Sequence, residues 1–149
     1  MTVWRLCQRS FTVLDGKGAA QVGGRWNSPG LPMVYTSTHL SLAILEVLVN
    51  LELTVDELPD DYVSIEIVVP DHLAISNLEH PLDLHDLDVT QGYGSQWLAT
   101  GSTVALQVPS VVVPKEDNVC LNPLHPDFKQ ISTVAIEPFE FDMRFFSSV

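Results

Sequence analysis

The pattern of apolar and polar residues predicts one main helix in the first third of the chain. The run from His39 to Leu51 is apolar at nearly every position, with one carboxylate, Glu46, among the aliphatic residues. Apolar residues on every side of a helix indicate burial on most sides. Desolvating an unpaired carboxylate costs on the order of several kcal/mol, so Glu46 is expected to be paired, protonated or in use.

Short segments rich in β-formers surround this helix. Strands are expected at residues 3–8, 33–37, 62–69, 104–108, 111–113, 133–136 and 139–145. In the first of them, Trp4 and Leu6 share one face, while Arg5 and Cys7 share the other. The polar, glycine- or proline-bearing connections are expected at residues 9–24, 54–61, 71–96 and 118–127, with one or two helical turns at 95–100. The sequence therefore predicts a single compact α+β domain over residues 1–149, with mostly antiparallel strands packed around one main buried helix.

Composition supports a globular protein with an uneven distribution of charge. Of the 149 residues, 46% are apolar and 17% are charged, which leaves little scope for disorder. The net charge is −12, yet residues 1–25 carry +3, so the remainder carries −15. An acidic chain repels nucleic acid, so no direct nucleic-acid partner is expected. The basic N-terminal segment is suited to holding a small anion such as phosphate or pyrophosphate.

The cysteines and the apolar runs indicate a soluble cytoplasmic protein without a membrane partner. Cys7 and Cys120 form no CxxC pair and no metal-type spacing, so we expect free thiols in a reducing compartment. Residues 1–10 hold two arginines and no long apolar core, unlike a signal peptide. No run approaches the ~20 apolar residues of a membrane span, since Glu46 interrupts the best one.

The common cofactor and metal motifs are missing. Gly92-Tyr93-Gly94 has Trp97 where a dinucleotide fingerprint needs its third glycine, and neither a Walker sequence nor HExxH occurs. Ser110 lies outside a GxSxG context. A cluster of histidines and aspartates fits no strong metal motif and is expected to form a solvated acidic loop: His80, Asp83, His85, Asp86 and Asp88. We therefore expect no metal and no resident cofactor.

Five polar residues beside apolar segments remain as candidates for chemistry: Arg25, Tyr35, Glu46, Ser110 and Asn118. Gly23-Gly24 gives the backbone freedom just before Arg25, which suits either a simple turn or a close approach to a ligand. Arg25 is the expected partner of Glu46, and a structural ion pair is one reading of both residues. Each of the others also has an ordinary role, Tyr35 as a core ring with a solvated hydroxyl, Ser110 in a turn and Asn118 as a loop cap.

The order of these residues and their neighbours resembles the RES domain family, which is named after an Arg, a Glu and a Ser. Those three residues map to Arg25, Glu46 and Ser110. The resemblance rests on Arg5 followed by five blocks: Gly24-Arg25-Trp26-Asn27, Val34-Tyr35-Thr36-Ser37, Leu42-Ala43-Ile44-Leu45-Glu46, Val108-Pro109-Ser110, and Asn118-Val119-Cys120-Leu121-Asn122-Pro123-Leu124-His125-Pro126. It extends to residues 141–144 and is weakest between residues 71 and 103.

This resemblance implies the toxin of a bacterial toxin–antitoxin pair with a fold similar to ADP-ribosyltransferases. The implied partner is an Xre-like helix-turn-helix antitoxin, and self-association within the complex follows by family analogy. The implied substrate is NAD⁺, from which nicotinamide is released to water or phosphate, so that cellular NAD⁺ is depleted and growth stops.

The candidate residues suit that reaction. Nicotinamide leaves as a neutral molecule, so one carboxylate suffices, and Glu46 is expected to stabilise the positive charge that develops on the ribose. Arg25 is expected to hold the pyrophosphate and Tyr35 to stack on the nicotinamide ring. The remaining substrate contacts are assigned to Arg5, Ser110 and Asn118.

Two alternatives remain open from the sequence. In the first, the same pocket transfers ADP-ribose to a protein. In the second, the chain is a non-catalytic regulatory partner of a DNA-binding protein, with Arg25 and Glu46 as an internal ion pair. Residues 71–96 are a candidate for a lid over the substrate.

Overall fold

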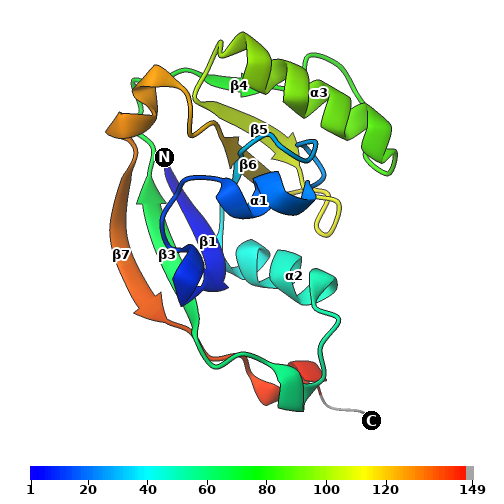
Figure 1. Cartoon of the computed structure of the whole chain (residues 1–149), viewed down its shortest axis with the longest axis vertical. Coiled ribbons are helices and arrows are strands. Elements are labelled where there is room, and N and C mark those ends of the chain that lie inside the picture. The colour runs from blue at the N-terminus through cyan, green and yellow to red at the C-terminus, as the bar shows by residue number, and fades with distance from the viewer. Residues whose placement is uncertain (147–149) are drawn as a thin grey trace.

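The strands form one seven-stranded, mostly antiparallel sheet, which confirms the predicted α+β class. The computed structural model describes residues 1–146. In sheet order the strands are β4 (Ile75–Asn77), β5 (Ala105–Pro109), β6 (Asp117–Leu121), β2 (Val34–Ser37), β1 (Thr2–Gln8), β3 (Tyr62–Val68) and β7 (Ser132–Pro138). β4 and β5 are parallel, and the other neighbours are antiparallel. Figure 1 shows β7 at one side of this sheet and β4, with α3 beside it, at the other.

The predicted main helix is α2 (Leu40–Asn50), which packs on β1 and β2. It is less buried than its composition suggested, because the sheet covers only one side of it. Leu42 and Ala43 are buried, whereas Leu45 and Val49 are 37% and 60% exposed. The residue at the N-cap is His39, and its side chain makes no capping hydrogen bond.

Two stretches predicted as loops contain helices. Residues 9–24 include the 3₁₀ turn η1 (Arg9–Phe11) and the short helix α1 (Lys17–Val22). Residues 71–96 include β4 and most of α3 (Leu87–Thr100), the longest helix of the described residues. The carboxylate of Asp86 caps α3 by accepting hydrogen bonds from the backbone N–H groups of Asp88 and Val89. Gly101, at a φ of 59°, ends the helix in the left-handed conformation.

Two strand predictions and one loop prediction in the last third of the chain are wrong. Residues 111–113 form bends, because two of their N–H groups bind the Ser110 side chain. The predicted loop 118–127 begins inside β6. Residues 139–145 form no strand; instead Phe139 and Phe141 join an aromatic cluster with Tyr62. The remaining 3₁₀ turns are η2 (Val55–Glu57), η3 (Pro126–Gln130) and η4 (Met143–Phe146).

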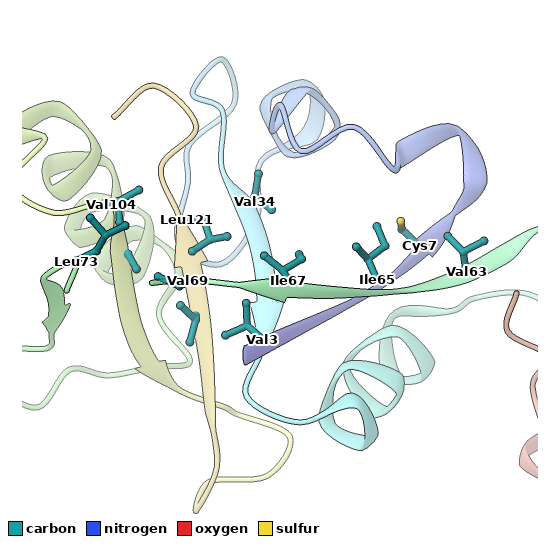
Figure 2. Packing of buried hydrophobic residues seen from close by; sticks show 12 residues of the cluster. Val3, Cys7, Val34, Val63, Ile65, Ile67, Val69, Leu73, Val104 and Leu121 are labelled. Atoms are coloured by element: carbon teal, nitrogen blue, oxygen red, sulfur yellow. The ribbon is translucent and has the colours of Figure 1, made fainter. Parts of the chain in front are cut away.

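The main core lies on one face of the sheet, and β1 divides its side chains between the two faces as predicted. Val3 and Cys7 belong to the core that Figure 2 shows, together with Ile65 and Ile67 of β3. Leu6 packs on the opposite face, against α2. Burying aliphatic side chains of this size contributes roughly 1.5–3 kcal/mol each, so these strands are the stable frame of the molecule.

The pairing of β1 and β2 is incomplete. β1 pairs with β3 over seven residues, but with β2 only where Trp4 lies opposite Ser37. Beyond that pair the two strands diverge. The Arg5 side chain crosses the gap and donates from Nη1 to the backbone carbonyl of Tyr35 at 3.1 Å. We call this opening between β1 and β2 the fork.

Both cysteines are free and buried, which leads to a chemical prediction. Burial raises the pKa of the Cys7 and Cys120 thiols above the ordinary value, so neither forms the reactive thiolate near neutral pH. We expect both thiols to remain unmodified by Ellman's reagent at pH 8 in the folded protein and to react fully in guanidinium chloride. Rapid labelling of either cysteine under native conditions would contradict this assignment.

Candidate active site

A cavity of about 1250 Å³ opens at the fork. Both diverging strands line it, with α1, α2 and the start of α3. Of the seven Lys and Arg residues in the chain, three line this cavity, Arg5, Lys17 and Arg25, beside two carboxylates, Asp15 and Glu46. The basic N-terminal segment therefore contributes a cationic wall inside an acidic protein, as its charge predicted. Five aromatic side chains also line the cavity: Trp4, Phe11, Trp26, Tyr35 and Tyr62.

Glu46 projects from α2 and is held by two neutral donors. Its Oε1 accepts hydrogen bonds of 2.7 Å from the hydroxyl of Ser110 and from the side-chain amide of Asn118. Among the residues that the structure describes, none donates to Oε2. One carboxylate oxygen is thus fixed by the protein, while the other is left for a ligand in the cavity.

The two donors are themselves held in place. Ser37, at the end of β2, donates to Oδ1 of Asn118 at 2.7 Å, so the Nδ2 group of Asn118 is directed at Glu46. Ser110 is 1% exposed, and its oxygen accepts from the backbone N–H groups of Val112 and Val113, both at 3.0 Å. A donor with fixed orientation loses little conformational freedom when it binds a carboxylate, so Glu46 is preorganised.

Replacing Ser110 by Ala tests this support. The change removes a hydrogen bond to Glu46 and leaves two backbone N–H groups without their acceptor. We expect a loss of about 1–3 kcal/mol in the free energy of unfolding, measured in urea. Ser41→Ala, at an exposed position of α2, is the matched control and should change stability little. Equal stability of the two variants would show that the Ser110 hydroxyl does not contribute to the free energy of unfolding.

Tyr35 is fixed by its hydroxyl. The hydroxyl is hydrogen-bonded within the protein, whereas that of an ordinary core tyrosine is solvated. The hydroxyl donates to Oδ1 of Asn27 at 2.6 Å and accepts from the backbone N–H of Trp26 at 3.0 Å. Burial raises the pKa of Tyr35 well above its usual range, so the phenol remains neutral. Asn27 is fully buried and donates to the carbonyls of Ala19 and Leu31, each at 2.9 Å. These contacts shape the loop that carries Arg25.

The predicted ion pair between Arg25 and Glu46 is wrong. Arg25 donates from Nη1 to the backbone carbonyl of Leu84, and among the described residues it forms no salt bridge with Glu46. The neutral donors on Oε1 take the place of a cation. The structure also gives a reason for glycine at position 24 that involves no ligand. A Cβ there would lie 2.6 Å from the Tyr35 hydroxyl.

The structure gathers the residues that the sequence singled out. Five of them line the cavity: Arg5, Arg25, Tyr35, Glu46 and Asn118. Ser110 lies behind them and reaches the cavity through Glu46. Sequence reasoning missed Ser37 as the residue that orients Asn118, and it missed Gln91, which lines the cavity and donates to the carbonyl of Gly24 at 2.8 Å. The sequence did contain a signal for the start of the helix that carries Gln91. Asp86 is a typical N-cap residue, and Asp88 places an acidic side chain in the first turn.

Two other kinds of feature are absent from the described residues. His80, His85 and their neighbouring aspartates contribute to no group of three side chains placed to hold a metal ion within residues 1–146. In the same part of the chain, no helix has the length and apolar character needed to cross a bilayer.

Comparison with known proteins gives matches over nearly the whole chain. The model of the RES domain matches residues 2–142. The protein Toxin Res of Photorhabdus laumondii is 36% identical over 160 residues, covering 97% of this chain and 96% of the relative. The Prs ADP-ribosylating toxin of Sphingobium sp. is 35% identical over 155 residues, covering 95% and 94%. The Toxin Res of Pseudomonas putida is 33% identical, covering 98% and 100%.

A solved structure shares the fold. A chain in the crystal structure of the M. tuberculosis MbcT–MbcA toxin–antitoxin complex superposes with a TM-score of 0.75 at 20% identity, covering 93% of this chain and 83% of the other. In this chain the structure places Arg25 and Glu46 at the cavity and Ser110 in contact with Glu46. Since the family model and the relatives match almost the full length, the chain belongs to the RES domain family.

Proposed function

We propose that this chain is the toxin of a bacterial toxin–antitoxin pair and that it cleaves the bond between nicotinamide and ribose in NAD⁺. The observation that carries the proposal is the state of Glu46, whose Oε1 is fixed by Ser110 and Asn118 while Oε2 is left to the cavity. The names of the relatives, Toxin Res and Prs ADP-ribosylating toxin, support the same reading. NAD⁺ is the substrate here, and no resident cofactor or metal is proposed.

The chemistry requires one well-placed negative charge. When the bond between ribose C1′ and the pyridinium nitrogen breaks, its electron pair returns to the nitrogen, so nicotinamide leaves neutral without a general acid. Positive charge develops on the ribose, and the carboxylate of Glu46 stabilises it through hydrogen bonds from the ribose hydroxyls to Oε2. Water or phosphate then attacks C1′. Water gives ADP-ribose and a proton, whereas phosphate gives the phosphorylated product.

Two arginines supply the binding of the pyrophosphate. Arg25 uses one N–H on the carbonyl of Leu84, so its other N–H donors are available to phosphate oxygens. Arg5 lines the same cavity, and its Nε is buried without a hydrogen-bond partner among the described residues. That atom is shielded from the cavity, so it is the position of a second guanidinium at the cavity wall that supports a role for Arg5 in holding the anion.

The Tyr35 ring is the proposed surface for the nicotinamide. Its hydroxyl is held by Asn27 and Trp26, so the ring has one orientation before substrate arrives. A fixed aromatic face at the cavity wall suits stacking on a flat heterocycle. Because the pKa of Tyr35 is raised, the ring stays uncharged and takes no part in proton transfer at neutral pH.

The test of the proposal is chromatography of NAD⁺ incubated with the purified chain, with and without phosphate. Free nicotinamide is expected in both samples. The second product, ADP-ribose or its phosphorylated form, identifies the acceptor. Intact NAD⁺ after incubation with a folded, antitoxin-free sample would refute the cleavage reaction.

Transfer of ADP-ribose to a protein is the second candidate, and two observations favour it. The Sphingobium relative is named an ADP-ribosylating toxin. The cavity is also bordered by exposed apolar side chains that a protein acceptor would cover, with Phe11, Val13 and Val22 being 45%, 71% and 78% exposed. Biotin-labelled NAD⁺ incubated with cell extract would mark a protein band if this transfer occurs. The absence of any labelled band would leave small acceptors only.

The proposed partner is an antitoxin with an Xre-like helix-turn-helix domain, which blocks the toxin in the cytoplasm until it is removed. The shared fold with a chain from a toxin–antitoxin complex supports such a partner. The acidic surface outside residues 1–25 suits a basic partner face, and self-association within the complex remains part of the proposal. The non-catalytic alternative loses the support of an Arg25–Glu46 ion pair, which is not among the salt bridges of the described residues.

A further inference from the structure

The segment 24–28, which carries Arg25, has no regular secondary structure and depends on its neighbours for its shape. Tyr35 and Asn27 hold it from the side of the sheet. Helix α3 holds it from the other side. The contacts of α3 are the evidence for a role of this helix in substrate binding.

One face of α3 meets the segment at positions spaced by three or four residues. Gln91 donates from Nε2 to the carbonyl of Gly24 at 2.8 Å. The Oγ of Ser95 lies 3.1 Å from the Oγ of Ser28. Just before the helix, the Leu84 carbonyl accepts from the Arg25 guanidinium. The residues on both sides of Arg25, and Arg25 itself, are thus tied to α3 and the turn that precedes it.

Gly94 sets the distance between the helix and the segment. A Cβ at this position would lie 1.8 Å from the carbonyl oxygen of Trp26, and the nearest atoms all belong to the Trp26 backbone. Backbone atoms cannot rotate away as a flexible side chain can. The helix can therefore pack this closely only with glycine at position 94. The close packing brings Gln91 within hydrogen-bonding distance of Gly24.

We propose that Gln91 is a positioning residue that acts through Arg25. Its side chain donates a hydrogen bond to the carbonyl of Gly24, the residue immediately before Arg25. This hydrogen bond fixes the peptide plane between Gly24 and Arg25 and so the direction of the guanidinium. The kinetic part of this inference rests on the proposed function, since it assigns Arg25 to the pyrophosphate of NAD⁺. Residues 84–95 are then a fixed wall of the substrate site, in place of the lid considered from the sequence.

Gln91→Met is the appropriate variant. Methionine has nearly the same length and helix propensity as glutamine but cannot donate to Gly24. Loss of one neutral hydrogen bond predicts a rise in the KM for NAD⁺ of about fivefold, with kcat within about twofold of wild type. Gln96→Met, at an exposed position of the same helix, is the matched control and should leave both constants unchanged.

A double-mutant cycle separates positioning from general support of the fold. If Gln91 acts through Arg25, adding Gln91→Met to Arg25→Ala raises the KM no further. If the two changes multiply, the proposal is overturned. It is also overturned if Gln91→Met leaves the KM within about 1.5-fold of wild type.

A second measurement needs no substrate and no activity. Hydrogen exchange of the backbone amides in residues 24–28 should be faster in Gln91→Met than in wild type or Gln96→Met, without acceleration in β3. Unchanged exchange at residues 24–28 would refute the positioning role even in an active enzyme. Faster exchange in a protein that leaves NAD⁺ intact would instead retain the positioning of Arg25 and refute the proposed substrate.

Discussion

Glu46→Gln is expected to lower the rate of nicotinamide release by about 10²- to 10³-fold, with a small change in the KM for NAD⁺. Glutamine keeps an oxygen that accepts from Ser110 and Asn118, so the local structure persists. What is lost is the negative charge that opposes the positive charge on the ribose. Because that charge exists mainly in the transition state, the effect falls on kcat more than on binding.

The measurement is the initial rate of nicotinamide release at saturating NAD⁺. Glu52→Gln makes the same chemical change at an exposed position just after α2 and should retain the wild-type rate. Matching thermal unfolding curves for the two variants show that the fold is intact. A Glu46→Gln enzyme with nearly wild-type turnover would remove Glu46 from the mechanism.

Arg25→Ala is expected to raise the KM for NAD⁺ by about 10²- to 10⁴-fold and to lower kcat as well. Two charge-assisted hydrogen bonds to phosphate oxygens are lost, and each contributes roughly 1.5–3 kcal/mol. The contact with the Leu84 carbonyl is lost with them, so substrate that still binds is less well placed. Binding of NAD⁺ by calorimetry and steady-state kinetics measure the two effects separately.

Arg9→Ala is the control for this loss of charge. Arg9 is an exposed residue of the same basic segment, outside the residues that line the cavity, so its removal should change the KM less than twofold. Arg25→Lys keeps the charge without the planar fork of donors and should give an intermediate KM. Equal effects of Arg9→Ala and Arg25→Ala would mean that only the overall charge attracts NAD⁺.

The frame of the fold could be predicted from the sequence because its elements bury aliphatic side chains with clear periods. α2 and β3 are examples, and so is the division of β1 residues between two faces. α3 was predicted only at its C-terminal end for a physical reason. The face of α3 that packs on residues 24–28 carries Gln91, Gly94 and Ser95, which contact backbone and hydroxyl groups of that segment. Such a face has no apolar stripe, and two glycines lower the helix propensity further.

The sequence singled out residues that gather at the cavity, but it did not predict how they pair. A carboxylate among aliphatic residues suggests a cationic partner, and Arg25 was the nearest one in the sequence. The structure satisfies Glu46 with neutral donors that lie 64 and 72 residues away, and Ser37 orients one of them across 81 residues. Those contacts depend on the order of strands β2, β6 and β5 in the sheet, which local patterns do not determine.

The fork between β1 and β2 also implies a conflict between stability and activity. If pairing continued past Trp4 and Ser37, the strands would gain main-chain hydrogen bonds and the Arg5 side chain would no longer need to bridge them. The same change would close the cavity that Arg5 and Tyr35 line. Selection for a working site therefore favours a sheet that is less stable than this chain could form, and stabilising substitutions in Arg5–Gln8 or Val34–Thr36 are expected to be inactivating.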